Sequence, residues 1–68
     1  MIILKTLNDK STALRPSGIV AVEEHPETPE ISAVIYILNR QSKKTNTIMV
    51  KHTVQEVVDA LNKVESWL

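Results

Sequence analysis

Residues 53–68, TVQEVVDALNKVESWL, decide the fold because they read as one amphipathic helix. Thr53 and Glu56 have the spacing of a capping box, in which the hydroxyl and the carboxylate satisfy backbone N–H groups that the first helical turn leaves unpaired. The apolar residues of this stretch recur at helical spacing and form one stripe: Val54, Val57, Val58, Leu61, Val64 and Leu68. Such a stripe needs an apolar surface to cover, so we expect the preceding residues to supply a sheet.

The composition favours one small, strand-rich domain with an aliphatic core. The chain has 68 residues, with no Phe, one Tyr and one Trp, and Ile, Val and Leu make up most of its apolar side chains. A chain of this length buries about 60% of its unfolded surface, which is enough for one core, so we expect a single domain over residues 1–68. The absence of Cys excludes disulfides and thiolate metal sites. Packing, or association of copies, must therefore stabilise the fold.

Five strands are predicted ahead of the helix, at residues 2–7, 11–15, 19–24, 30–38 and 47–51. Turn signals separate them, among them Asn8-Asp9-Lys10, Pro16-Ser17-Gly18 and the prolines at 26 and 29. Short connections favour antiparallel neighbours. We therefore predict an α+β fold, a small curved antiparallel sheet of four to five strands with one C-terminal helix packed across it.

The predicted strand 30–38 is apolar on both faces. Alternate positions put Ile31, Ala33, Ile35 and Ile37 on one side and Val34, Tyr36 and Leu38 on the other. One helix covers only one side of a small sheet. The second apolar face therefore indicates sheet curvature, barrel closure or a partner chain, and a second copy of this chain is the first expectation.

The most polar stretch, residues 39–46, predicts an exposed hairpin tip that carries Arg40, Lys43 and Lys44. With Tyr36 and Trp67, these three residues are the candidate interaction residues. The basic tip is suited to phosphate contacts, and Lys5, Lys10 and Arg15 extend it if they share a face. Only Tyr36 and Trp67 are available for base stacking, so a solvated loop is the ordinary alternative. Trp67 is expected to close the helix onto the sheet or to pack on a neighbouring subunit.

No residue cluster predicts catalysis, a cofactor site or a metal site. The two histidines are His25, which lies in a proline turn among glutamates, and His52, which precedes the helix. A metal site at His25 is weighed against a solvated acidic turn, which we favour. The chain has a single Gly, so it lacks a glycine-rich phosphate loop, and no Ser lies in a glycine-flanked elbow. We expect that the protein is not an enzyme.

The charge balance gives no overall field for a charged polymer, because eight basic residues balance eight acidic ones. The first residues reach a lysine too soon for a signal-peptide core, and no apolar run approaches the roughly 20 residues that span a bilayer. We therefore expect no membrane insertion and a cytoplasmic location.

The order of motifs along most of the chain resembles the FlbD/SwrD family of small flagellar proteins. The matching elements are Met1-Ile2, Leu7-Asn8, Leu14-x-Pro16, Ile19-x-x-Val22-Glu23-Glu24-x-Pro26-x-Thr28, Ile37-Leu38-Asn39 and Val50-Lys51-x-Thr53-Val54-x-Glu56-Val57. The chain departs from the family at its turns, where Asn8-Asp9 and Asn39-Arg40 stand in place of the common Asn-Gly. The resemblance implies a non-enzymatic accessory protein that acts through protein contacts and is linked to flagellar motility.

Two classes of function follow. The first is a protein-interaction module that meets a partner or itself, as a homo-oligomer, through strand edges, the Tyr36 face or the 39–46 tip. The alternative is a small single-stranded nucleic-acid-binding protein of phage or replication type, since several strands followed by a C-terminal helix also describe such folds.

Overall fold

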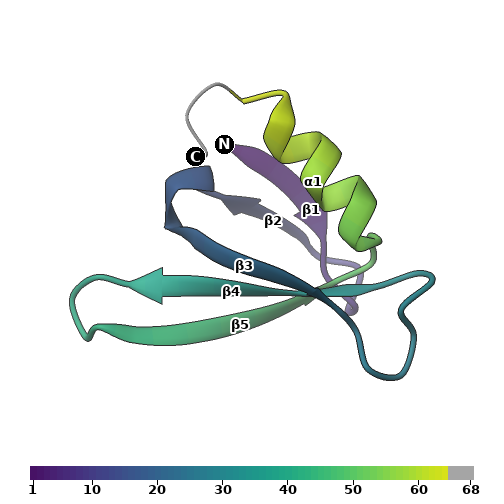
Figure 1. The fold of residues 1–68 in the computed structure, drawn as a ribbon, viewed down its shortest axis with the longest axis horizontal. Coiled ribbons are helices and arrows are strands. Elements are labelled where there is room, and N and C mark those ends of the chain that lie inside the picture. Colours follow the sequence, from purple (N-terminus) through teal and green to yellow (C-terminus); the bar gives the residue numbers. More distant parts are fainter. Residues whose placement is uncertain (65–68) are drawn as a thin grey trace.

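The computed structural model describes residues 1–64, which form five strands, one 3-10 turn and one helix (Figure 1). In chain order these are β1 (Ile2–Lys5), β2 (Ser11–Leu14), η1 (Pro16–Gly18), β3 (Ile19–Glu24), β4 (Ala33–Asn39), β5 (Lys44–Val50) and α1 (Val54–Asn62). The predicted α+β class and the order of elements are therefore confirmed.

The predicted single sheet of four to five strands is not confirmed, because the strands divide into two antiparallel sheets. β1 pairs with β2, and a second sheet has the order β3-β4-β5. The two sheets meet at one corner, where Thr6 bridges Val50 and the Lys51 N–H donates to the Lys5 carbonyl at 2.8 Å. β1 pairs with β2 over four residues, and only the residues just after it reach β5. The two sheets are thus joined by backbone contacts at this corner.

A β-bulge in β3 determines which of its side chains face the core. The register pairs Ile19 with Ile37 and Ala21 with Tyr36, so Val20 is the extra residue. A bulge of this kind shifts the alternation by one position. Ile19 and Val22 both join the core as a result, whereas Val20 is exposed.

The core lies between α1 and the inner faces of the two sheets. Val57 and Leu61 of α1 are fully buried, as are Ile35 of β4 and Val50 of β5. The remaining buried apolar residues of the cluster are Ile2, Leu4, Leu14, Ile19 and Ala33. Full burial of each large aliphatic side chain contributes about 1.5–3 kcal/mol, so the stripe of α1 stabilises the fold by closing this core.

The helix begins as predicted and ends earlier than predicted. The Thr53 hydroxyl accepts from the Glu56 N–H at 3.1 Å, and a Glu56 carboxylate oxygen accepts from the Thr53 N–H at 2.9 Å. α1 ends at Asn62, and Lys63 is its C-cap. The predicted extension of the helix to residue 68 falls partly on residues 65–68, which lie outside the described residues. These include Leu68 of the predicted stripe and the candidate interaction residue Trp67.

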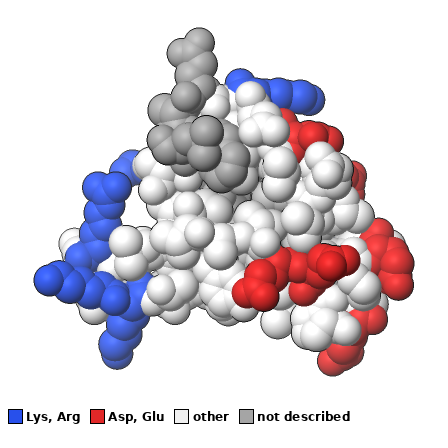
Figure 2. Space-filling model, viewed as in Figure 1, with Lys and Arg blue, Asp and Glu red and all other residues white. Residues whose placement is uncertain are grey.

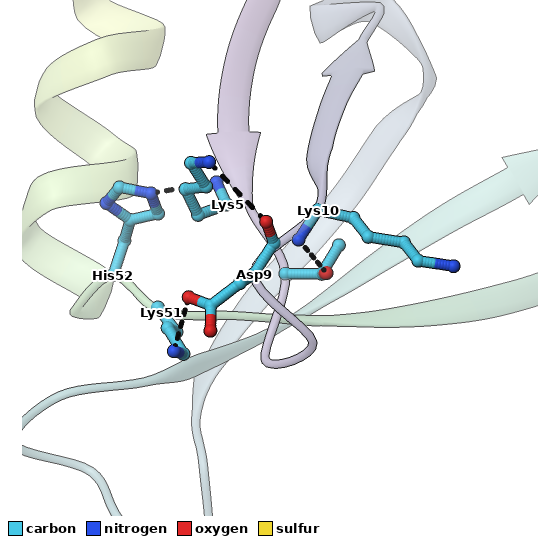
Figure 3. A network of polar contacts seen from close by, with 6 residues as sticks. Lys5, Asp9, Lys10, Lys51 and His52 are labelled. Carbon is cyan, nitrogen blue, oxygen red and sulfur yellow. Dashed lines mark hydrogen bonds and ion pairs between the residues drawn. The ribbon is translucent and has the colours of Figure 1, made fainter.

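The β1–β2 turn anchors the corner where the sheets meet (Figure 3). Asp9 has a positive φ of 63°, which Asp adopts more readily than most residues, as the sequence predicted for this turn. Its carboxylate lies 2.6 Å from the Lys51 ammonium, which holds the pKa of Asp9 below its usual value through a hydrogen bond and through its charge. His52 Nε2 accepts from the Lys5 N–H at 3.1 Å. His52 therefore has a structural contact between β1 and the residues ahead of α1.

The capping box yields the first prediction. Removing the Thr53 hydroxyl in Thr53→Ala should lower the free energy of unfolding by about 1 kcal/mol, because the Glu56 N–H loses its acceptor. Urea denaturation followed by circular dichroism measures the change. Thr53→Ser keeps the hydroxyl and serves as the matched control. Equal loss in the two variants would contradict a role for the cap.

Candidate interaction surface

The outer face of the β3-β4-β5 sheet, on the side away from α1, carries the main surface of interest. β4 supplies Val34, Tyr36 and Leu38, which alternate with the core residues of the same strand. The register sets Met49 beside Val34, Thr47 beside Tyr36 and Thr45 beside Leu38 on β5, and Glu23 and Ala21 beside Val34 and Tyr36 on β3. We call these eight residues the outer face.

The outer face carries apolar side chains on both sides of Tyr36, and they are partly uncovered. Val34 is only 7% exposed although it does not belong to the core cluster, so its shielding comes from outside that cluster. Leu38 and Met49 remain 40% and 46% exposed. The sequence predicted this second apolar face from alternation in β4. It did not single out Met49, whose position across from Val34 follows from the β4–β5 register.

Ile31 departs from the predicted facing because β4 begins only at Ala33. Residues 25–32 form a closed loop in which the His25 N–H donates to the Ser32 carbonyl, and Ile31 precedes the strand and is 64% exposed.

The loop between β4 and β5 is shorter than predicted, because β5 begins at Lys44 rather than at residue 47. Strand pairing continues to Asn39 and Lys44 because the Asn39 side chain caps the turn, accepting from the Gln41 N–H at 3.0 Å.

Tyr36 has an acidic neighbour on the outer face. The Glu23 carboxylate raises the pKa of the Tyr36 phenol above its usual value, first through a hydrogen bond and then through its negative charge. The neutral phenol is the form that donates to the carboxylate, so the contact favours the protonated ring. A carboxylate beside the ring disfavours a phosphate-bearing ligand at this position.

On the face drawn in Figure 2, most basic side chains lie towards one end of the long strands and most acidic side chains towards the other. Arg40, Lys43 and Lys44 lie at the β4–β5 tip, and Arg15 lines the same hollow as Arg40. The opposite ends of β3 and β4, and the loop between them, carry Glu23, Glu24, Glu27 and Glu30. Within residues 1–64, none of the four basic side chains has an ion-pair partner. The tip end of the sheet is therefore basic, whereas the opposite end combines the four glutamates with Lys51, which pairs with Asp9.

The structure brings together only part of the basic residues named from the sequence. Arg15 joins Arg40 at the tip end, whereas Lys5 and Lys10 lie at the β1–β2 turn near Asp9 (Figure 3). Tyr36 lies on the outer face, beside the strand that leads to the tip. Trp67 lies outside the described residues. Nothing in the sequence indicates that Arg15 and Arg40 lie close together, because they follow strands of two different sheets.

His25 holds a turn in place. Its side chain is buried, and its Nδ1 accepts from the Glu27 N–H at 3.1 Å and from the Thr28 N–H at 3.4 Å. Ser32 is fully buried in the same loop, where its hydroxyl donates to the Thr28 carbonyl at 2.9 Å. Both polar side chains are satisfied within the loop. Among residues 1–64, no group of three or more His, Asp or Glu is arranged to hold a metal ion.

Comparison with protein-family models, with curated proteins and with solved structures found no match. In the part of the chain that the structure describes, no helix has the length and apolar character needed to cross a membrane.

The His25 turn generates the second prediction. His25→Leu should lower the free energy of unfolding by about 1–3 kcal/mol, because two backbone donors lose their acceptor. His25→Asn keeps an acceptor at the same number of bonds from Cβ and should be less destabilised, although Leu is the more apolar replacement. Urea denaturation compares the two variants. Greater stability of the Leu variant would mean that packing, not the acceptor, is what this position requires.

Tyr36 generates the third prediction. As the only tyrosine in the chain, its ionisation can be followed by the near-ultraviolet absorbance of tyrosinate. The midpoint should lie above the ordinary value of about 10 and should fall in Glu23→Gln but not in the neighbouring control Glu24→Gln. The pKa of Tyr36 is higher in the folded chain than in the unfolded chain. The contact with Glu23 therefore contributes to stability below about pH 10, and this contribution is lost as the pH rises through the raised pKa. An equal shift in both variants would contradict the assignment.

Proposed function

We propose that this protein is a non-enzymatic interaction module that associates with a second copy of itself through the outer face. The observation that carries the proposal is the exposed apolar side chains of that face: Met49 is exposed beside the shielded Val34, and Leu38 is exposed on the same face of β4, nearer the tip. The core covers only the inner side of β4. A small domain without disulfides gains stability by covering the other side.

Charge complementarity supports a second copy as the occupant. A two-fold axis that sets the strands of two copies antiparallel brings the basic tip of each copy to the acidic end of the other. A parallel arrangement would bring like charges together and is disfavoured. The two ends differ in charge, since the unpaired Arg40, Lys43 and Lys44 stand at the tip and four glutamates stand at the other end, where Lys51 is paired with Asp9. The surface is therefore complementary to itself in charge as well as in apolar character.

The process in which the module acts is proposed from sequence. The resemblance to the FlbD/SwrD family suggests an accessory role in flagellar motility, exercised in the cytoplasm through protein contacts. A pre-formed dimer presents two identical sets of surfaces to such a partner. This assignment rests on the motifs Val22-Glu23-Glu24-x-Pro26-x-Thr28 and Thr53-Val54-x-Glu56-Val57.

Single-stranded nucleic-acid binding is the second candidate, and one observation favours it. Arg15 adds a fourth basic side chain to the tip end. The stacking platform that such binders use is less well supported, because Tyr36 has the Glu23 carboxylate as its neighbour. The protein-interaction function therefore has the stronger support.

The fourth prediction concerns self-association. Sedimentation equilibrium of the full chain should detect a two-chain species whose dissociation increases with salt, because the paired ends are exposed and screened. Met49→Glu inserts a charge beside Val34 on the outer face and should weaken association by at least about tenfold. Both the variant and the wild type should show the same circular dichroism, since Met49 is half exposed.

Ile3→Glu provides the matched control. Ile3 is 72% exposed on β1, in the other sheet, so the same change of charge should leave association unaltered. A wild-type chain that stays monomeric at about millimolar concentration, or equal weakening by the two substitutions, would refute self-association through the outer face.

A further inference from the structure

A hollow of about 430 Å³ lies where the end of β2, η1 and the end of β4 come together. Arg15 follows β2 and Arg40 follows β4, so residues far apart in the sequence line the same hollow. Its lining also includes Met1, Ile37 and Leu38. The hollow meets the outer face at Leu38 but draws most of its lining from β2, η1 and the tip. It is thus a separate feature of the basic end.

The two guanidinium groups at this hollow have no partner among residues 1–64. An arginine side chain carries five N–H donors in a planar fork that matches a carboxylate or a phosphate. The hydroxyl of Ser17, which also lines the hollow, makes no hydrogen bond within the described residues. The polar part of the lining therefore offers donors to an anion and no fixed negative charge.

The apolar part of the lining narrows the class of ligand. Met1, Ile37 and Leu38 are aliphatic or thioether side chains that favour an apolar group next to the anion. No aromatic ring lines the hollow, so a nucleobase has no platform for stacking there. A peptide that carries a carboxylate next to an aliphatic side chain meets both requirements.

We propose that this hollow binds an acidic peptide segment of a partner protein. A carboxylate of the segment lies between Arg15 and Arg40, and a neighbouring aliphatic side chain packs against Ile37 and Leu38. Binding here goes beyond self-association, because the hollow takes most of its lining from the end of β2, from η1 and from the tip and not from the outer face.

Fluorescence anisotropy with a labelled acetyl-Glu-Leu-Glu-Leu-amide peptide tests the proposal. The acidic peptide should bind saturably, and its glutamine analogue should not. Arg15→Gln with Arg40→Gln should weaken binding by at least about tenfold, since two charge-assisted contacts are lost. Lys43→Gln with Lys44→Gln makes the same change in net charge at the same end and should weaken binding by less than about threefold.

Three further measurements separate this site from its alternatives. The Met49→Glu variant changes the outer face and no residue of the hollow, so it should bind the peptide with unchanged affinity. A labelled oligothymidylate and inorganic phosphate should both bind more weakly than the acidic peptide. Equal losses in the two double variants, loss of peptide binding in Met49→Glu, tighter binding of oligothymidylate, or no saturable binding of the peptide would each overturn the proposal.

Discussion

The structure depends on β4, whose two faces are both apolar. Its inner side chains, Ala33 and Ile35, are fully buried against the core that α1 closes. Its outer side chains begin with the shielded Val34 and end with the exposed Leu38. Because β4 pairs on both edges, with β3 and with β5, its position also fixes the register of both neighbours. The core and the candidate surface are therefore two sides of one strand.

Local polar contacts hold the loops on either side of β4 and the start of α1. His25 accepts two backbone N–H groups in the loop that leads into β4, Asn39 caps the turn that leaves it, and Thr53 caps the helix that covers it. Each contact satisfies backbone donors that a turn or a helix end leaves unpaired. The hydrogen bonds of His25 thus hold the turn in which it lies.

Separation of charge links the fold to the proposed interactions. The strands run the length of the sheet, so residues at a turn and residues at the opposite loop end up at opposite ends of the molecule (Figure 2). The net charge of the chain is zero and therefore does not indicate this separation of charge. The four basic side chains then serve two surfaces: the tip contributes to the self-complementary outer face, and Arg15 with Arg40 lines the hollow. Both proposals rely on basic groups that the described fold leaves unpaired.

By itself, the sequence determined the local elements. Helical spacing and the capping box located the start of α1, alternation identified β4 as apolar on both faces, and Asp9 marked a turn, because these features depend on residues close together in the chain. Only the tertiary structure decided how the elements combine. The split into two sheets, the bulge that turns Ile19 and Val22 inward, and the meeting of Arg15 with Arg40 all arise from pairing between distant segments. Such pairing depends on the register and packing of whole strands, so a short sequence motif does not predict it.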